Sequence, residues 1–180
     1  PCSGEFDFAV WNENHTAYIK MERTESDEVL YLQTKLDKNP VTRFLALSAL
    51  FEREMVRLLE DENASPSEAF AKEVMRTLKD EELMQSCGAM PLLMFESVSD
   101  PRFSHAYAKL YSAKQKILRN IAGLFKEELL GLYAKYAETL PKNGFCPGVL
   151  SAQFKRNAVR NLILTILAAL DSADVQELIS

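Results

Sequence analysis

The chain has 180 residues, of which 47% are hydrophobic and 26% charged, and this composition suits one globular domain with a substantial core. Its formal net charge of −5 at pH 7 argues against nucleic-acid binding, because a phosphate backbone attracts basic surfaces. No apolar run reaches the roughly 18 residues that a membrane-spanning helix needs, and no signal peptide is visible. The three cysteines, Cys2, Cys87 and Cys146, form neither a disulfide framework nor a zinc motif. We therefore expect an intracellular, cytoplasmic protein with reduced thiols.

Residues 6–21 alternate apolar and polar side chains in the manner of two β-strands. The stretches "FDFAVW" and "TAYIKM" flank "NENH", which predicts a hairpin with a four-residue turn. Two strands alone are only marginally stable in water. We therefore interpret residues 1–25 as the edge of a partner sheet or of a domain outside this sequence.

The next three predicted elements are helices with marked starts. Ser26 caps the first helix, and Asn39-Pro40 ends it and begins the second. Ser65 caps the third, where Glu68 completes a capping box. Their apolar residues recur at spacings of three and four: Val29, Leu32 and Leu36; Phe44, Leu47, Phe51, Met55 and Leu58; Phe70, Val74 and Leu78.

Two short helices are predicted to follow. Asp80 caps the first of them and Gly88 stops it. The stretch "LLMFESV" at residues 92–98 predicts the second, after which Asp100-Pro101 is again a cap followed by proline.

Two long apolar helices complete the pattern. Residues 101–140 keep a helical period throughout, and 40 residues is long for one helix, so we expect a break near Asn120 or Gly123. Residues 151–170 predict a helix whose last half is so apolar that we expect it to be internal. A last short helix is predicted to begin at residues 171–172.

The order of elements predicts an all-α fold. We expect a right-handed superhelical stack of antiparallel helix pairs, of the HEAT or armadillo kind, over residues 26–180, after a short N-terminal β remnant at residues 1–25. The last helix lacks the polar outer face that a terminal repeat needs. We therefore interpret the helical domain as truncated.

Few residues can carry catalysis or bind a metal. The chain has two histidines, His15 and His105, and neither has a second histidine four residues on, which excludes a His-Glu-x-x-His zinc motif. A cysteine nucleophile could pair Cys87 or Cys146 with His105, but buried cysteines more often act as small hydrophobes. We therefore predict no catalytic residue and no metal ligand, and leave the substrate-binding residues unknown.

One polar cluster stands out in the C-terminal third. Lys155, Arg156 and Arg160 precede the apolar run "NLILTILAAL". A solvated helix face explains such a cluster most simply, and a binding role is the alternative.

Two stretches resemble one enzyme family. "NPVTRFLALSAL" at residues 39–50 resembles the segment that opens the C-terminal helical domain of M1-family aminopeptidases of the bacterial aminopeptidase N type. "FKRNAVRNLILTILA" at residues 154–168 resembles a helix deeper in that domain. The matching positions are Asn39, Pro40, Arg43, Phe44 and Ala46, then Lys155, Arg156, Arg160 and Asn161. The likeness covers most of residues 16–170.

The resemblance implies a piece of a zinc exopeptidase that removes N-terminal residues from peptides. In that family a separate domain holds zinc with a His-Glu-x-x-His motif and a downstream Glu, and a Gly-x-Met-x-Asn motif binds the substrate amine. Neither motif occurs in this chain, so no catalytic or metal residue transfers to it. Residues 1–25 would then be the remnant of the β-sandwich domain that precedes the helices.

We therefore expect a non-catalytic C-terminal helical segment that shapes peptide access to the active site of a metalloprotease. The segment alone should be inactive and bind no zinc, and its partners would be the catalytic domain and the remaining C-terminal helices. The alternative is a stand-alone helical-repeat adaptor that binds a partner peptide in a groove.

Overall fold

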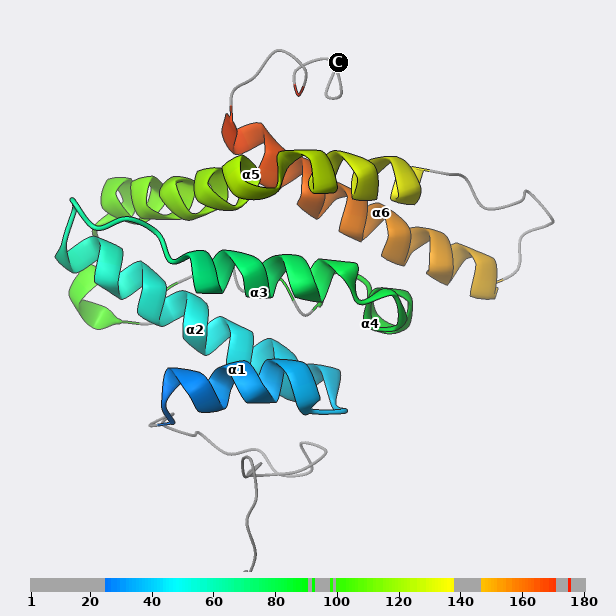
Figure 1. Cartoon of the computed structure of the whole chain (residues 1–180), viewed down its shortest axis with the longest axis horizontal. Helices are drawn as coiled ribbons and strands as arrows, with labels where there is room; N and C mark the ends of the chain where they lie inside the picture. The colour runs from blue at the N-terminus through cyan, green and yellow to red at the C-terminus, as the bar shows by residue number, and fades with distance from the viewer. Residues whose placement is uncertain are drawn as a thin grey trace, which may run out of the picture.

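A computed structural model describes residues 25–90, 92, 98, 100–137, 147–170 and 175. Within these residues every regular element is helical (Figure 1). The elements are α1 (Asp27–Leu36), α2 (Pro40–Glu60), α3 (Glu68–Lys79), α4 (Glu81–Cys87), the 3₁₀ helix η3 (Pro101–Phe103), α5 (Tyr107–Ala137), α6 (Pro147–Leu167) and the 3₁₀ helix η4 (Ala168–Leu170). The hairpin predicted at residues 6–21 lies outside the described residues, as do most of the helices predicted at 92–98 and after residue 170.

The helices stack in chain order. α1 packs on α2, α3 and α4 form the next layer, and α5 lies against α3, α2 and α6. Figure 1 shows this order from α1 at the bottom to the α5–α6 pair at the top. The prediction of an all-α stack of helix pairs is confirmed, and the right-handed superhelix stays a prediction. None of the described helices is both long and apolar enough to cross a bilayer.

Several predicted helix starts are confirmed at the level of hydrogen bonds. The Asn39 side chain accepts from Val41 N–H at 2.9 Å, with Pro40 in the first turn of α2. Asp80 accepts from Leu83 N–H at 3.0 Å at the start of α4. These caps satisfy amides that have no carbonyl partner inside the helix. Ser26 holds the cap position of α1 without a side-chain hydrogen bond.

The start of α3 corrects one prediction. The cap is Ser67, whose Oγ accepts from Phe70 N–H at 3.3 Å, and not Ser65. Side chains of α2 hold the preceding residues out of the helix, because Arg57 donates to the Ser65 carbonyl at 2.6 Å and Glu54 accepts from Ser67 N–H at 2.6 Å. The predicted capping box therefore does not form at Ser65.

The two long helices differ from their predicted bounds. The break expected near Asn120 or Gly123 lies at Phe125, where φ is −129° and ψ is 27°. α6 begins at Pro147, four residues before the predicted start at 151, because proline suits the first turn of a helix. Along the apolar half of α6, Ile163 is fully buried while Thr165 is exposed, so that half is buried on one side and not all round.

One apolar core runs through the stack. It takes residues from every α-helix, including Leu30, Phe51, Val74, Met84, Ile121 and Ile163. The six buried polar and charged residues of the described chain are instead confined to the first three helices, α1, α2 and α3. They are Gln33, Thr34, Thr42, Glu54, Glu73 and Thr77.

Candidate functional site

The most connected polar site joins the end of α1 to α2, α3 and α4. The last carbonyls of a helix have no partner within it, and here the Thr34 carbonyl accepts from Arg43 Nε and from Arg76 Nη2, both at 2.8 Å. Arg43 also donates from Nη2 to Asp80 Oδ2 at 2.8 Å. Since Asp80 caps α4, one guanidinium holds the end of one helix and the start of another.

The ionisation of Asp80 reflects this arrangement. Burial acts to raise the pKa of Asp80, but the hydrogen bond from Leu83 N–H and the Arg43 guanidinium outweigh it. The pKa of Asp80 therefore lies below its ordinary value. The carboxylate stays charged at neutral pH and supports the junction between α2 and α4.

Two buried glutamates, on α3 and α2, form further ion pairs in these layers. Glu73 accepts from the Thr34 hydroxyl at 2.6 Å and from Arg76 Nε at 2.9 Å. Glu54 accepts from Arg57 through both oxygens, at 2.8 and 3.0 Å. Each carboxylate is compensated by an arginine three residues later on its own helix, which reduces the cost of burying its charge.

The pKa of Tyr31, on α1, is shifted by the same environment. Burial, followed by the nearby carboxylate of Asp27, raises the pKa of Tyr31 to about 12. A phenol with so high a pKa stays protonated and does not act as a base at neutral pH. The network is therefore built for structure, with every charge held against a helix end or an opposite charge.

The basic cluster of α6 also binds helix ends. Lys155 Nζ donates to the Ser86 carbonyl at 2.6 Å, in the last turn of α4. Arg156 donates to the Lys135 carbonyl at 2.7 Å, in the last turn of α5, and lies over the ring of Tyr136 at 5.7 Å. A cation is favourable at a helix C-terminus. Neither residue is part of a simple solvated face, as the sequence suggested.

Arg160, the third member of the cluster, is half-buried. Its Nε is buried and has no hydrogen-bond partner among the described residues. The structure therefore brings Lys155 and Arg156 to two helix ends, whereas Arg160 Nε has no such bond among the described residues.

The cysteine–histidine alternative finds no support in the geometry. The Cys87 thiol donates to the Leu83 carbonyl at 3.0 Å, and burial raises its pKa. A reactive thiol needs the opposite shift. Cys87 ends α4, whereas His105 lies between η3 and α5, and these elements are at opposite sides of the stack in Figure 1. Cys146, the other candidate nucleophile, and His15 lie outside the described residues.

The described residues also do not fit a zinc ion. Nowhere in that part of the chain do three or more histidine, cysteine, aspartate or glutamate side chains gather to hold a metal. Zinc in proteins takes three or four such ligands. No chemistry through a metal is therefore assigned to these residues.

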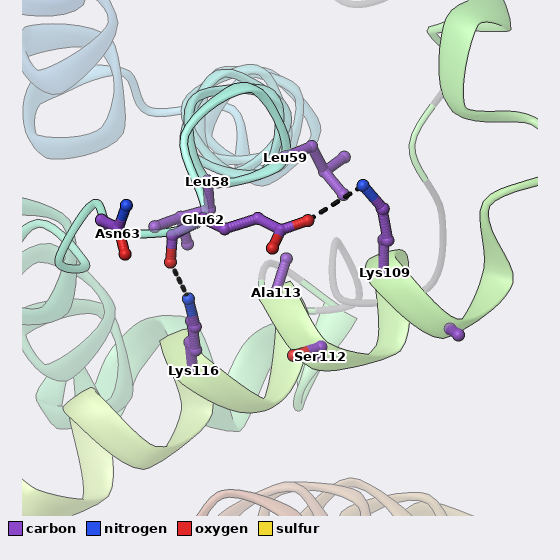
Figure 2. Close-up of a pocket in the computed structure, with 9 residues that line it drawn as sticks. Leu58, Leu59, Glu62, Asn63, Lys109, Ser112, Ala113 and Lys116 are labelled. Carbon is purple, nitrogen blue, oxygen red and sulfur yellow. Dashed lines mark hydrogen bonds and ion pairs between the residues drawn. The ribbon is translucent and has the colours of Figure 1, made fainter.

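A cleft of about 400 Å³ lies between the end of α2 and the first turns of α5 (Figure 2). It is lined by Leu58, Leu59, Glu62, Asn63, Ala108, Lys109, Ser112, Ala113 and Lys116. The Glu62 carboxylate pairs with Lys109 Nζ at 2.9 Å, and the Glu62 carbonyl accepts from Lys116 Nζ at 2.5 Å. The hydrogen bond from Lys109 lowers the pKa of Glu62. The cleft is large enough for a small ligand, but its lining residues offer no nucleophile–base pair.

Comparison with known families places the chain. Residues 27–180 match the family described as "Domain of unknown function (DUF3458_C) ARM repeats". The chain belongs to this family. The match begins at the first residue of α1, so the ARM-repeat domain and the helical stack coincide over the described residues. Among curated proteins no match was found.

ARM-repeat membership agrees with the geometry. In such proteins each helical repeat contacts mainly its neighbours, and the stacked surface serves for binding. The bonds of the basic cluster to helix ends were not predicted from the sequence. The sequence also contains a one-sided stretch: residues 101–126 include no acidic side chain and six basic ones. Counting both signs along the chain would have found this stretch.

Proposed function

We propose that this ARM-repeat chain is a non-catalytic C-terminal segment of an M1 zinc aminopeptidase, where it shapes the access of peptides to an active site on another domain. The zinc and the catalytic groups would belong to that domain. The chain would contribute a rigid wall, and its own residues would take no part in bond cleavage.

One observation carries the proposal. Three of the residues through which the chain resembles that family connect helices of the stack. Arg43 fastens the end of α1 and the cap of α4, and Lys155 and Arg156 fasten the ends of α4 and α5. A motif that fixes the angles between helices suits a domain whose contribution is shape.

The gene around this sequence gives the most direct test. We expect a His-Glu-x-x-His motif with a downstream Glu to be encoded upstream of residue 1 in the same reading frame. A frame that begins and ends with this segment would contradict the proposal and favour the stand-alone adaptor.

A second test uses the purified chain. We expect no release of N-terminal residues from aminoacyl p-nitroanilides, with or without added zinc, and no stoichiometric zinc by metal analysis. Zinc-dependent hydrolysis that follows the chain through purification would overturn the non-catalytic role.

A further inference from the structure

The first turns of α5 expose two large aromatic side chains. Tyr107 is 73% exposed and Tyr111 is 67% exposed, and they are one helical turn apart. The same face of α5 continues through Leu118 and Ala122, which are buried. One stripe along α5 is therefore open at its N-terminal end and covered farther along.

The covered part of the stripe shows what kind of element fits it. Beside Leu118, Arg119 donates from Nε to the Ala169 carbonyl at 3.0 Å, so the end of the α6–η4 helix lies against this part of α5. Figure 1 shows the N-terminal half of α5 extending beyond η4. The open end thus lies on α5 beyond the part that the end of the α6–η4 helix contacts.

The charged residues of this part of the sequence are all basic. Residues 101–126 contain no acidic residue, and their basic residues are Arg102, Lys109, Lys114, Lys116, Arg119 and Lys126. Of these, Lys114 lies one turn from Tyr111, on the tyrosine side of the helix. Neither Lys114 nor Arg119 forms an ion pair with a carboxylate of the described residues, and the Lys116 ammonium bonds to a backbone carbonyl.

We propose that this overhang, formed by Tyr107, Tyr111 and Lys114, is a docking surface for an acidic amphipathic helix from a partner. The partner's apolar side chains would cover the two tyrosine rings, beside the part of α5 that the end of the α6–η4 helix contacts. Its acidic side chains would face Lys114 and its neighbours. Tyrosine is well suited to such a surface because the ring buries apolar area and the hydroxyl keeps its hydrogen bonds to water.

A protein partner fits the overhang better than a nucleic acid. Glu62 pairs with Lys109, and Glu60 and Asp100 pair with Arg102. Three carboxylates therefore stand at the edge of the basic stretch. They would repel phosphates, whose binding requires many unopposed cations. A helix with a few acidic residues needs fewer unopposed cations. This inference does not depend on the proposed enzyme family.

Fluorescence anisotropy with a labelled synthetic peptide tests the inference. The peptide has about 18 residues, leucines at helical spacing and glutamates on both flanks, and it is titrated with the full chain. We expect binding in about the micromolar range that weakens as salt is raised. The Tyr107→Ser/Tyr111→Ser variant should weaken it at least about tenfold, and Lys114→Glu should also weaken it.

Matched variants control for unspecific effects. Leu150→Ser/Phe154→Ser removes an exposed apolar pair of the same spacing on α6, and Lys72→Glu reverses an exposed charge on α3; both should leave binding unchanged. Equal weakening by these controls, or no binding by the wild-type chain, would overturn the inference. So would stronger binding of a single-stranded oligonucleotide, or self-association that the tyrosine variant abolishes without any peptide binding. Because the substituted side chains are exposed or, at Lys114, half-buried, thermal unfolding should change little in every variant.

Discussion

The two ends of the stack are held together by different forces. Between α1 and α3, buried side chains include charged and hydroxyl groups, and hydrogen bonds from Arg43 and Arg76 connect helix to helix. Between α5 and α6, the buried side chains of the described residues are apolar, and Arg119 and Arg156 each donate to a backbone carbonyl near a helix end. Hydrogen bonds fix one relative position of two helices, whereas apolar packing depends mainly on volume. The first layers should therefore respond to changes of charge, and the last layer to changes of size.

The largest effect is expected from a cavity in the α5–α6 layer. Ile163 is fully buried, and Ile163→Ala should lower the free energy of unfolding by about 3–4 kcal/mol, through lost burial and the cavity that remains. Ile163→Val should cost only about 1 kcal/mol. Urea denaturation measures both. Equal costs for the two variants would show that volume does not govern this layer.

Arg43→Ala tests the polar layers. The variant removes the bonds to the Thr34 carbonyl and to Asp80, and we expect a loss of about 2–3 kcal/mol, because the side chain is largely buried and its carboxylate partner is left behind. Arg43→Lys keeps the charge but cannot reach both acceptors, so it should recover only part of the loss. Full recovery by lysine would mean that charge alone, and not the two-way bond, matters.

Asp80 makes the stability of the first layers depend on pH. Because the pKa of Asp80 is lowered by folding, its contribution is present at neutral pH and disappears as the pH falls below the ordinary value of 3.8 through the lower folded pKa. Asp80→Asn keeps a capping side chain but loses the charge. It should cost about 1 kcal/mol at pH 7 and nothing at low pH, where the wild type is protonated as well. A cost that persists in acid would assign the effect to the cap.

The smallest effect is expected on the outer side of α5. Gly131 lies inside the helix, and a methyl group added there would meet no other atom within 4 Å. Gly131→Ala should raise the free energy of unfolding by about 0.5–1 kcal/mol, because glycine loses more backbone freedom on folding. Gly88→Ala is the contrasting variant. Gly88 has a φ of +64°, and an added methyl would lie 3.2 Å from Lys155 Cβ. The Gly88→Ala protein should therefore be less stable than the wild type.

The fold could be predicted from local signals because most helix boundaries are set locally. Asn39, Asp80 and Gly88 act within one turn of their own position, and all three were assigned correctly. The cap of α3 could not be found this way. Ser65 and Ser67 both suit a cap, and the choice between them is made by Glu54 and Arg57, on another helix.

The site was less predictable because its chemistry depends on distant pairs. The spacing of Glu73 and Arg76 suggests an exposed ion pair on one helix, and nothing local shows that Thr34, 39 residues earlier, binds the same carboxylate. Lys155 likewise looked solvated, although its partner is the Ser86 carbonyl of α4. Backbone carbonyls at helix ends carry no sequence signal, so residues that bind them resemble surface charges.

Asp80 has one further consequence, which concerns where the chain tolerates changes of length. It is both the C-cap of α3 and the N-cap of α4, so no further residue separates these helices. One inserted residue would turn α4 by about 100° relative to α3. It would also take either the carboxylate away from Arg43 or the end of α4 away from Lys155. Natural relatives should therefore vary in length between α2 and α3, where six residues form the turn before Ser67, and keep a fixed length across Asp80.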